Sequence, residues 1–129
     1  MRPQRSPEAH GSLEYVARGD SRYPVSLTDL SDPPGGLWSI GQWETLTAPV
    51  VAIVGTRRAT PYGERITREL SGALARAGAC IVSGMARGID AAAHRAALGV
   101  NGRTVAVLGT GVQRGLLVGL ESQRVVEFG

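Results

Sequence analysis

Apolar residues in the middle of the chain form short runs that alternate with segments of helical periodicity. Each run ends at a glycine-containing turn. Strands alternating with helices predict a parallel sheet with crossover connections, so we expect an α/β fold with a Rossmann-like parallel sheet and flanking helices. The predicted strands are residues 50–54, 80–83 and 104–108, and the predicted helices are residues 61–77 and 90–98.

The first predicted helix has clear local signals. Thr60 is a suitable N-cap, and Pro61 fits the first helical position. The strand before it, residues 50–54, is almost entirely β-branched, which is typical of a strand covered on both faces. Apolar residues recur along the helix at spacings of three and four, and we expect that side to be buried. These residues are Ile66, Leu70, Ala73, Leu74 and Ala77.

The pattern divides the chain into three parts. Residues 1–20 are polar and predict a mobile N-terminal tail. Residues 21–47 form a lead-in with a strong Pro-Pro-Gly-Gly turn signal, which we expect to pack on the core. Residues 48–129 form the Rossmann-like domain. Trp38 and Trp43 are expected to anchor the lead-in, although stacking on nucleobases is the alternative.

The glycine-containing turns are the candidate binding residues, because strands of a parallel sheet carry their ligands outside their carboxyl ends. Backbone N–H groups, hydroxyls and guanidinium groups in such turns can hold phosphate. Ordinary connecting turns with solvent-facing arginines are the alternative. The candidates are Gly55, Thr56, Arg57, Arg58 and Thr60 in the first turn, Ser83, Gly84, Arg87 and Gly88 in the second, and Gly109 and Thr110 in the third.

Two titratable residues follow the second turn. Asp90 is expected to cap the second helix and to orient Arg87. His94 lies one turn further along an alanine-rich face, where a packed or hydrogen-bonded role is the commoner one for histidine. Neither residue has a catalytic partner nearby in sequence, so we expect no enzyme chemistry here.

Positive charge is concentrated in the strand and helix region. The chain has a formal net charge of +3, and all its basic residues are arginines. A GC-rich genome explains the arginine bias, but the guanidinium still binds phosphate through two hydrogen bonds and stacks on bases. Residues 50–111 hold eight arginines and three acidic residues, whereas acidic residues outnumber arginines in the rest. This distribution favours a polyanionic ligand.

The remaining composition narrows the class of protein. Cys80 is the only cysteine, so we expect no intrachain disulfide, and a metal site is improbable with only two histidines. The N-terminal residues lack the apolar stretch of a signal peptide, and no segment has the length of a membrane span. We expect a cytoplasmic protein without a cofactor.

Several long motifs resemble the DNA-processing protein A (DprA/Smf) family. They are VAIVGTRRATPYG, SGMARGIDAAAHRAAL and GRTVAVLGTGV, together with the lead-in YPVSLTDLSDPPGGLWSIG. The resemblance covers residues 22–112. It implies a Rossmann-like domain that binds single-stranded DNA and performs no catalysis. It also implies a homodimer, a RecA-type recombinase as partner, and a role in recombination or natural transformation.

Carried over to this sequence, the resemblance places phosphate contacts on Gly55 to Arg58 and on the second turn. Two other functions stay open. The turns could hold one nucleotide, as in nucleotide sensors or hydrolases of the same superfamily, or the chain could be a protein-interaction module without a ligand.

The residues after Val112 depart from the family pattern. They faintly resemble a later family segment, which predicts a helix over residues 114–120 and a strand over residues 125–127. A compact or incomplete C-terminal part would leave a sheet of at most four strands with exposed edges. We therefore expect a homodimer or other oligomer, or a missing partner.

Overall fold

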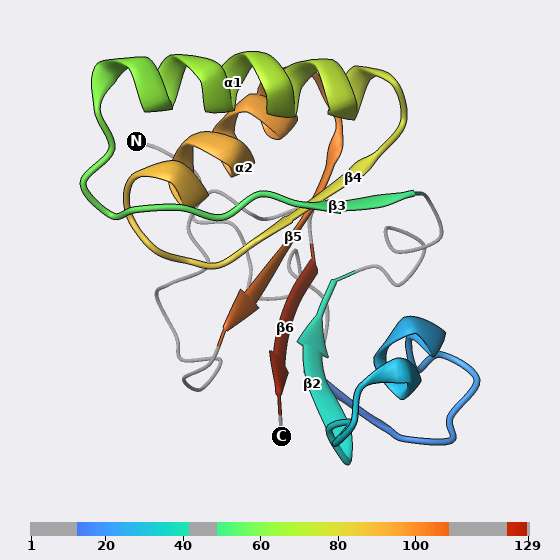
Figure 1. Ribbon diagram of the computed structural model, residues 1–129. Coiled ribbons are helices and arrows are strands. Elements are labelled where there is room, and N and C mark those ends of the chain that lie inside the picture. Colours follow the sequence, from blue (N-terminus) through green and yellow to red (C-terminus); the bar gives the residue numbers. More distant parts are fainter. Residues whose placement is uncertain (1–12, 42–48, 109–123, 129) are drawn as a thin grey trace, which may run out of the picture.

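The protein folds into one mixed sheet with two helices on one side (Figure 1). The computed structural model describes residues 13–41, 49–108 and 124–128. The elements are β1 (Glu14–Ala17), the 3₁₀ helix η2 (Val25–Asp29), β2 (Gly36–Ile40), β3 (Val50–Ala52), α1 (Pro61–Arg76), β4 (Cys80–Ser83), α2 (Ile89–Gly99), β5 (Arg103–Leu108) and β6 (Arg124–Phe128).

The sheet has the order β1-β2-β6-β5-β4-β3 within the described residues. Strands β3, β4, β5 and β6 run parallel to one another, whereas β2 pairs antiparallel with β6 and β1 pairs antiparallel with β2. The parallel strands β3, β4 and β5 and both helices confirm the predicted α/β architecture. Strand β6 confirms a C-terminal strand, whereas the helix expected over residues 114–120 lies outside the described residues.

The sheet is wider than the sequence suggests. At most four strands were expected, but the described residues form six, because the lead-in supplies β2 and the expected tail supplies β1. Val16 pairs with Leu37 across these two strands, and Arg22 forms an ion pair with Glu14 at 3.0 Å. The expectation of a mobile tail over residues 1–20 is therefore wrong for residues 14–20, which are held by strand pairing and ion pairs.

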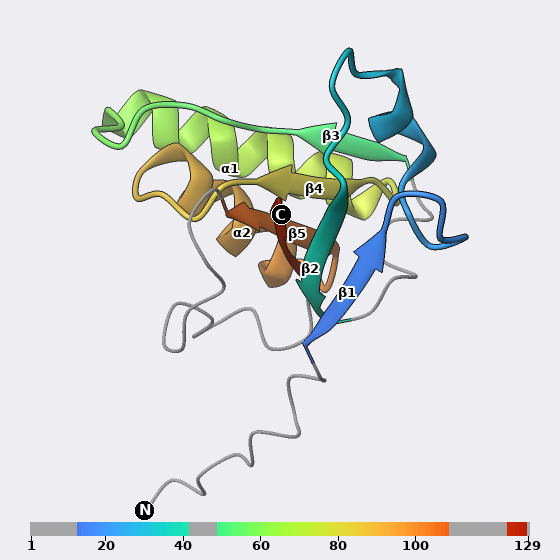
Figure 2. The same cartoon turned by 90° about the horizontal axis from the view of Figure 1, so that it is seen from below.

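Hydrophobic cores lie on both sides of the parallel strands. Cys80 and Ile81 are neighbours on β4 and point to opposite faces. Ile81 packs with Ala93 and Ala97 of α2 on the helical side. Cys80 packs with residues of the N-terminal segment, which lies across the other face (Figure 2). Burial raises the pKa of the Cys80 thiol to about 11, so this side chain stays protonated and behaves as a small apolar group.

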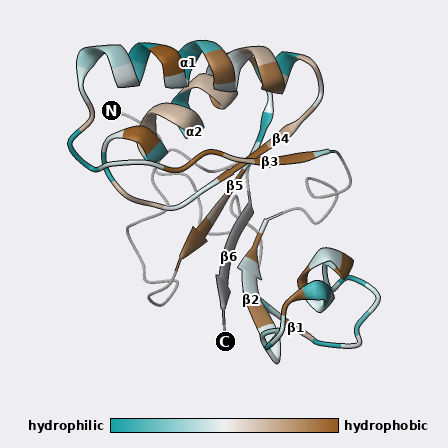
Figure 3. Ribbon diagram, viewed as in Figure 1, coloured by the Kyte–Doolittle hydropathy of each residue, from teal (hydrophilic) through white to brown (hydrophobic). Residues whose placement is uncertain are grey.

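Strand β3 differs from its prediction. It lies at the end of the sheet, and its apolar character is visible in Figure 3. Ile53, just after the strand, packs against the helical core, whereas Val50 and Val54 are exposed. Cover on both faces was expected, but the N-terminal segment packs over β4 and β5 and leaves one face of this edge strand open.

Helix α1 begins as predicted but buries a different face. Thr60 Oγ1 accepts a hydrogen bond from the Gly63 N–H at 3.0 Å, which caps the helix start. The predicted apolar face is mostly exposed, since Ile66 and Leu70 keep 38% and 51% of their surface. The helix packs along α2, and the small residues on that contact allow the two backbones to approach closely. The buried residues are Thr67, Ser71, Gly72 and Ala75.

Trp38 lies on the outer face of β2, where its ring is 4.9 Å from that of Tyr15. It contacts β1 and keeps 41% of its surface exposed, so the expected anchoring of the lead-in on the core by this residue is not observed, while Trp43 lies outside the described residues. The part of the chain that the structure describes holds no helix of the length and apolarity that crossing a bilayer needs.

Candidate nucleic-acid interface

The first candidate turn follows β3 at the carboxyl end of the sheet. Gly55, Thr56, Arg57 and Arg58 are all exposed. Thr56 Oγ1 accepts a hydrogen bond from the Arg58 N–H at 3.1 Å, which is the one side-chain hydrogen bond formed within this stretch of described residues. Neither guanidinium forms an ion pair or hydrogen bond with another described residue. Both are therefore available to an anionic ligand.

Thr60 closes this turn as a helix cap. Its hydroxyl oxygen accepts from Gly63, so its position is set by the start of α1. The hydroxyl oxygen is the acceptor in this hydrogen bond, so the hydroxyl hydrogen can still be donated to another group. The structure thus gives Thr60 a capping role, and its predicted contact with phosphate stays a prediction.

The second turn follows β4 and lies beside the first, because β3 and β4 are neighbours in the sheet. Ser83 was predicted as a phosphate donor, but its side chain is buried and its hydroxyl donates to the Ile53 carbonyl at 2.5 Å. Ser83 thus joins the ends of the two strands. Arg87 is exposed and has no ion pair among the described residues. It is the cation that this turn offers to a ligand.

Gly88 joins the two turns. Its φ is +79°, a conformation that L-residues other than glycine rarely adopt. A Cβ atom at this position would overlap the carbonyl oxygen of Thr56 and lie 2.7 Å from that of Arg57. The next N–H, that of Ile89, donates to the Thr56 carbonyl at 3.1 Å. The two candidate turns are therefore in direct backbone contact.

Gly55 also brings the two turns together, because it lies against the Ile89 side chain at the start of α2. A Cβ atom there would lie 2.7 Å from the Ile89 side chain, so glycine is what allows the first turn to approach α2. Contacts between residues more than 30 positions apart set the geometry of both turns.

Asp90 has a different role from the one predicted. The N-cap of α2 is Gly88, and no side chain caps this helix. Asp90 is buried, and its Oδ2 accepts from the Ala86 N–H at 3.4 Å, within the second turn. No ion pair joins it to Arg87 in the described part of the chain. Asp90 therefore holds the turn's backbone, and the predicted orientation of Arg87 by this carboxylate is not observed.

His94 is the best-connected side chain near the second turn. Its Nε2 lies 2.7 Å from the Gly84 carbonyl, which can only accept, so Nε2 donates. Its Nδ1 lies 2.6 Å from Thr104 Oγ1 on β5. Burial lowers the pKa of His94, which favours the neutral ring. The Thr104 hydroxyl lies within hydrogen-bond distance of both Nδ1 and the Ile81 carbonyl, at 2.8 Å from the latter, so its single hydrogen serves one of these two acceptors at a time. His94 thus connects α2, β5 and the second turn, as the hydrogen-bonded role predicted.

The third predicted turn cannot be compared in the same way. Strand β5 lies next to β4, so its end faces the same edge of the sheet as the first two turns. Gly109 and Thr110 follow it and lie outside the described residues. Over the described ranges, His, Cys, Asp and Glu side chains form no group of three or more that could hold a metal ion.

Comparison with known proteins identifies the family of this fold and these turns. Residues 14–117 match the model of the family described as DNA recombination-mediator protein A. The chain belongs to this family, the DprA/Smf family. Protein Smf of Synechocystis is 46% identical over 103 residues, covering 77% of this chain and 26% of that protein. DNA processing protein DprA of Bacillus subtilis is 39% identical over 102 residues, covering 78% of this chain and 34% of that protein.

Solved DprA structures share the fold. The X-ray structure of DprA from Streptococcus pneumoniae matches with a TM-score of 0.80 at 32% identity, over 90% of this chain and 44% of that one. DprA from Helicobacter pylori, whose structure addresses a single-stranded DNA binding mode, matches with a TM-score of 0.74 at 30% identity, over 92% of this chain and 56% of that one. The chain spans about a quarter to a third of the length of these two curated DprA/Smf relatives.

Proposed function

We propose that this chain binds single-stranded DNA at the two joined turns and performs no chemistry on it. The observation that carries this proposal is the set of exposed guanidinium groups of Arg57, Arg58 and Arg87 at the carboxyl edge of the sheet. Family membership and the DNA-binding relative from Helicobacter pylori support the ligand class. Binding of this kind combines backbone electrostatics with base stacking and is tolerant of sequence.

The absence of chemistry is proposed from the state of the titratable side chains. Asp90 and His94 are the acid and the base nearest to the second turn, and both are buried. Both nitrogens of His94 have hydrogen-bond partners within the fold, and Asp90 holds a backbone N–H. General acid–base catalysis needs a group within reach of the substrate, and neither residue offers one.

The wider biological role follows as part of the same proposal. Family membership supports a role in recombination or natural transformation, with a RecA-type recombinase and a second copy of the chain as partners. A DNA-binding role supports a cytoplasmic location. Residues 48–129 would form the binding domain, and residues 21–47 a supporting segment.

Fluorescence anisotropy with labelled oligo-dT at low salt tests the binding. Arg57→Ala should weaken binding by a factor of about 10 to 100, because a charge-assisted hydrogen bond to phosphate contributes about 1.5–3 kcal/mol. It should also make the dependence of log K on log salt shallower by about 0.7, the value for one phosphate contact in a single strand. Arg76→Ala is the matched control, since Arg76 is exposed at the far end of α1 and its loss changes the net charge equally.

No binding of oligo-dT by the wild-type chain at low salt would contradict the proposal. An equal effect of the two substitutions would show that net charge, and not the first turn, governs the affinity.

A further inference from the structure

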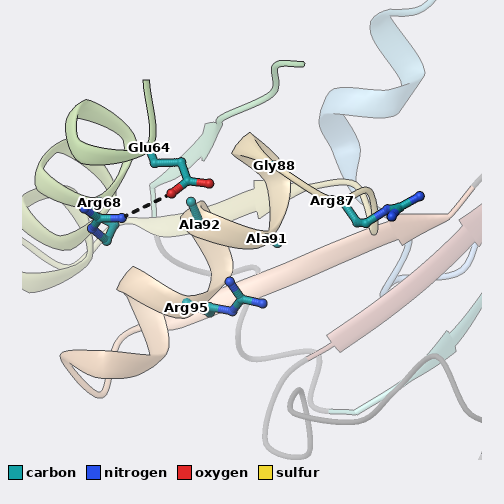
Figure 4. A pocket seen from close by; sticks show the side chains of 7 residues that line it. All are labelled: Glu64, Arg68, Arg87, Gly88, Ala91, Ala92 and Arg95. Carbon is teal, nitrogen blue, oxygen red and sulfur yellow. Dashed lines mark ion pairs between the residues drawn. The ribbon is translucent and has the colours of Figure 1, made fainter. Parts of the chain in front are cut away.

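A hollow separates the N-terminal halves of α1 and α2, behind the two turns. Its volume is about 320 Å³. Gly88 has no side chain and Ala91 and Ala92 have only a methyl group, so these residues leave this space open between the helices. The remaining walls are longer side chains from both helices (Figure 4). The lining residues are Glu64, Arg68, Arg87, Gly88, Ala91, Ala92 and Arg95.

The hollow is electropositive, because Arg68 and Arg95 line it together with a single carboxylate, that of Glu64. Glu64 and Arg68 form an ion pair at 3.7 Å that is largely exposed on both sides, and such pairs contribute little and exchange partners readily. Arg95 has no ion pair or hydrogen bond among the described residues. In Figure 4, Arg87 points away from Glu64 and Arg68. Two cations, Arg68 and Arg95, are therefore positioned around the hollow, and one carboxylate, Glu64, lies beside Arg68 (Figure 4).

The hollow also adjoins the first turn. Gly88 lines it and at the same time contacts the carbonyl groups of Thr56 and Arg57. Only Gly88 separates the first turn from the hollow, so a DNA strand bound at the first turn can extend into the hollow. Arg87, which precedes Gly88 and points away from the hollow, lies along such a path.

We propose that the hollow is a second phosphate-binding subsite, in which Arg68 and Arg95 hold a phosphate group. The inference rests on the proposed function, because the phosphate would then belong to a nucleotide further along the strand bound at the first turn. A free nucleotide presents the same chemistry, and the volume of the hollow suits a group of that size. The subsite extends DNA contact from the edge of the sheet onto the helical layer.

An oligo-dT length series tests the subsite. Arg95→Ala should weaken binding of an oligo-dT of about 16 nucleotides several-fold, and leave binding of one of about four nucleotides unchanged. Arg68→Ala should act in the same direction. For the long oligonucleotide, each substitution should also make the slope of log K against log salt concentration shallower by about 0.7. Arg76→Ala is again the control, and circular dichroism checks that each variant folds.

The outcomes separate the subsite from the proposed function. If Arg57→Ala weakens binding while Arg95→Ala behaves like Arg76→Ala, the subsite is wrong and single-stranded DNA binding stands. Equal losses for the short and long oligonucleotides would also overturn a separate subsite.

Thermal-shift titrations with dTMP and inorganic phosphate test whether the phosphate in the hollow belongs to a free nucleotide instead of a DNA strand. If wild-type protein binds no oligo-dT but is stabilised by dTMP, and Arg95→Ala abolishes that stabilisation, the subsite stands with a free nucleotide as ligand and the proposed function fails. If neither oligo-dT nor dTMP nor phosphate binds, the subsite is overturned together with the proposed function.

Discussion

The two turns at the edge of the sheet lie side by side but are held in different ways. The first turn, residues 55–60, exposes two guanidinium groups and contains a single side-chain hydrogen bond before its cap. The second turn, residues 84–90, is held from inside by Asp90 and His94. Gly88 connects them.

This difference suggests a division of work. The second turn is fixed by the buried side chains of Asp90 and His94, so its backbone is held in place by the fold. The first turn carries its charge on the surface, where the arginines can adjust to a ligand. Substitutions in the support should therefore affect the free energy of unfolding, whereas substitutions of the exposed arginines should affect affinity alone.

Gly88→Ala should produce the largest loss of stability. It places a Cβ atom against the Thr56 carbonyl at a positive φ, where the neighbouring atoms are backbone and cannot rotate away. We expect the free energy of unfolding to fall by about 3 kcal/mol, measured by urea denaturation.

Gly72→Ala is the matched control for this change. Gly72 is inside α1, and a Cβ atom there would meet nothing within 4 Å outside the helix's own backbone. Alanine should stabilise the protein by about 0.5–1 kcal/mol at this position. If both substitutions proved neutral, the close contact between the two turns would be wrong.

His94→Ala should have the next largest effect. It removes the donor to the Gly84 carbonyl and the partner of Thr104, and leaves a cavity between α2 and β5. We expect a loss of about 2 kcal/mol in the free energy of unfolding.

His94→Gln separates the hydrogen bond from the packing, since the glutamine amide can still donate toward Gly84. It should recover part of the stability and most of the affinity for oligo-dT. Equal destabilisation by Ala and Gln, with unchanged DNA affinity in both, would show that His94 fills space without holding the turn.

Mild acid should produce the smallest effect. Burial lowers the pKa of His94 below its ordinary value of 6.5, so the unfolded chain takes up a proton before the folded one does. The unfolded state binds more protons in this window, and stability therefore decreases as the pH falls below about 6.5, with no contribution from His94 above it. Thermal melts between neutral and mildly acidic pH should show this decrease in wild type. In the His94→Gln variant, the melting temperature should depend less on pH over this range, because residue 94 no longer titrates.

Local signals were sufficient to predict much of the fold. Glycine after each apolar run and the Thr60-Pro61 pair identified strands β3, β4 and β5 and the start of α1, because turns and caps depend on neighbours in sequence. The exposed positions of Arg57 and Arg87 followed from the same turns.

The features that the sequence did not predict depend on contacts between residues that are far apart in the chain. The spacing of Ile66 and Leu70 indicated one apolar side of α1, but not that small residues near Ser71 would face α2 instead. Likewise, Ser83 has the chemistry of a phosphate donor, and only the position of the Ile53 carbonyl commits its hydroxyl elsewhere.

Arg68 and Arg95, the two arginines at the hollow, were also not singled out from the sequence, because their proximity depends on contacts between distant residues. Arg95 lies one helical turn after Ala91, and Arg68 one turn after Glu64, so each helix alone shows an ordinary exposed spacing. Only the packing of α1 on α2 places the two arginines around one hollow. The pair of alanines at 91 and 92 beside Gly88 was the available signal, because short side chains there leave room.

The backbone contact at Gly88 also affects the entropy of binding. A flexible loop that closes on a ligand loses conformational freedom at that moment, and this loss subtracts from the affinity. Here the Ile89 N–H and the Thr56 carbonyl already fix the backbone of one turn against the other when the chain folds. A ligand at this edge therefore has to order little more than the arginine side chains, and most of its interaction energy remains available for affinity.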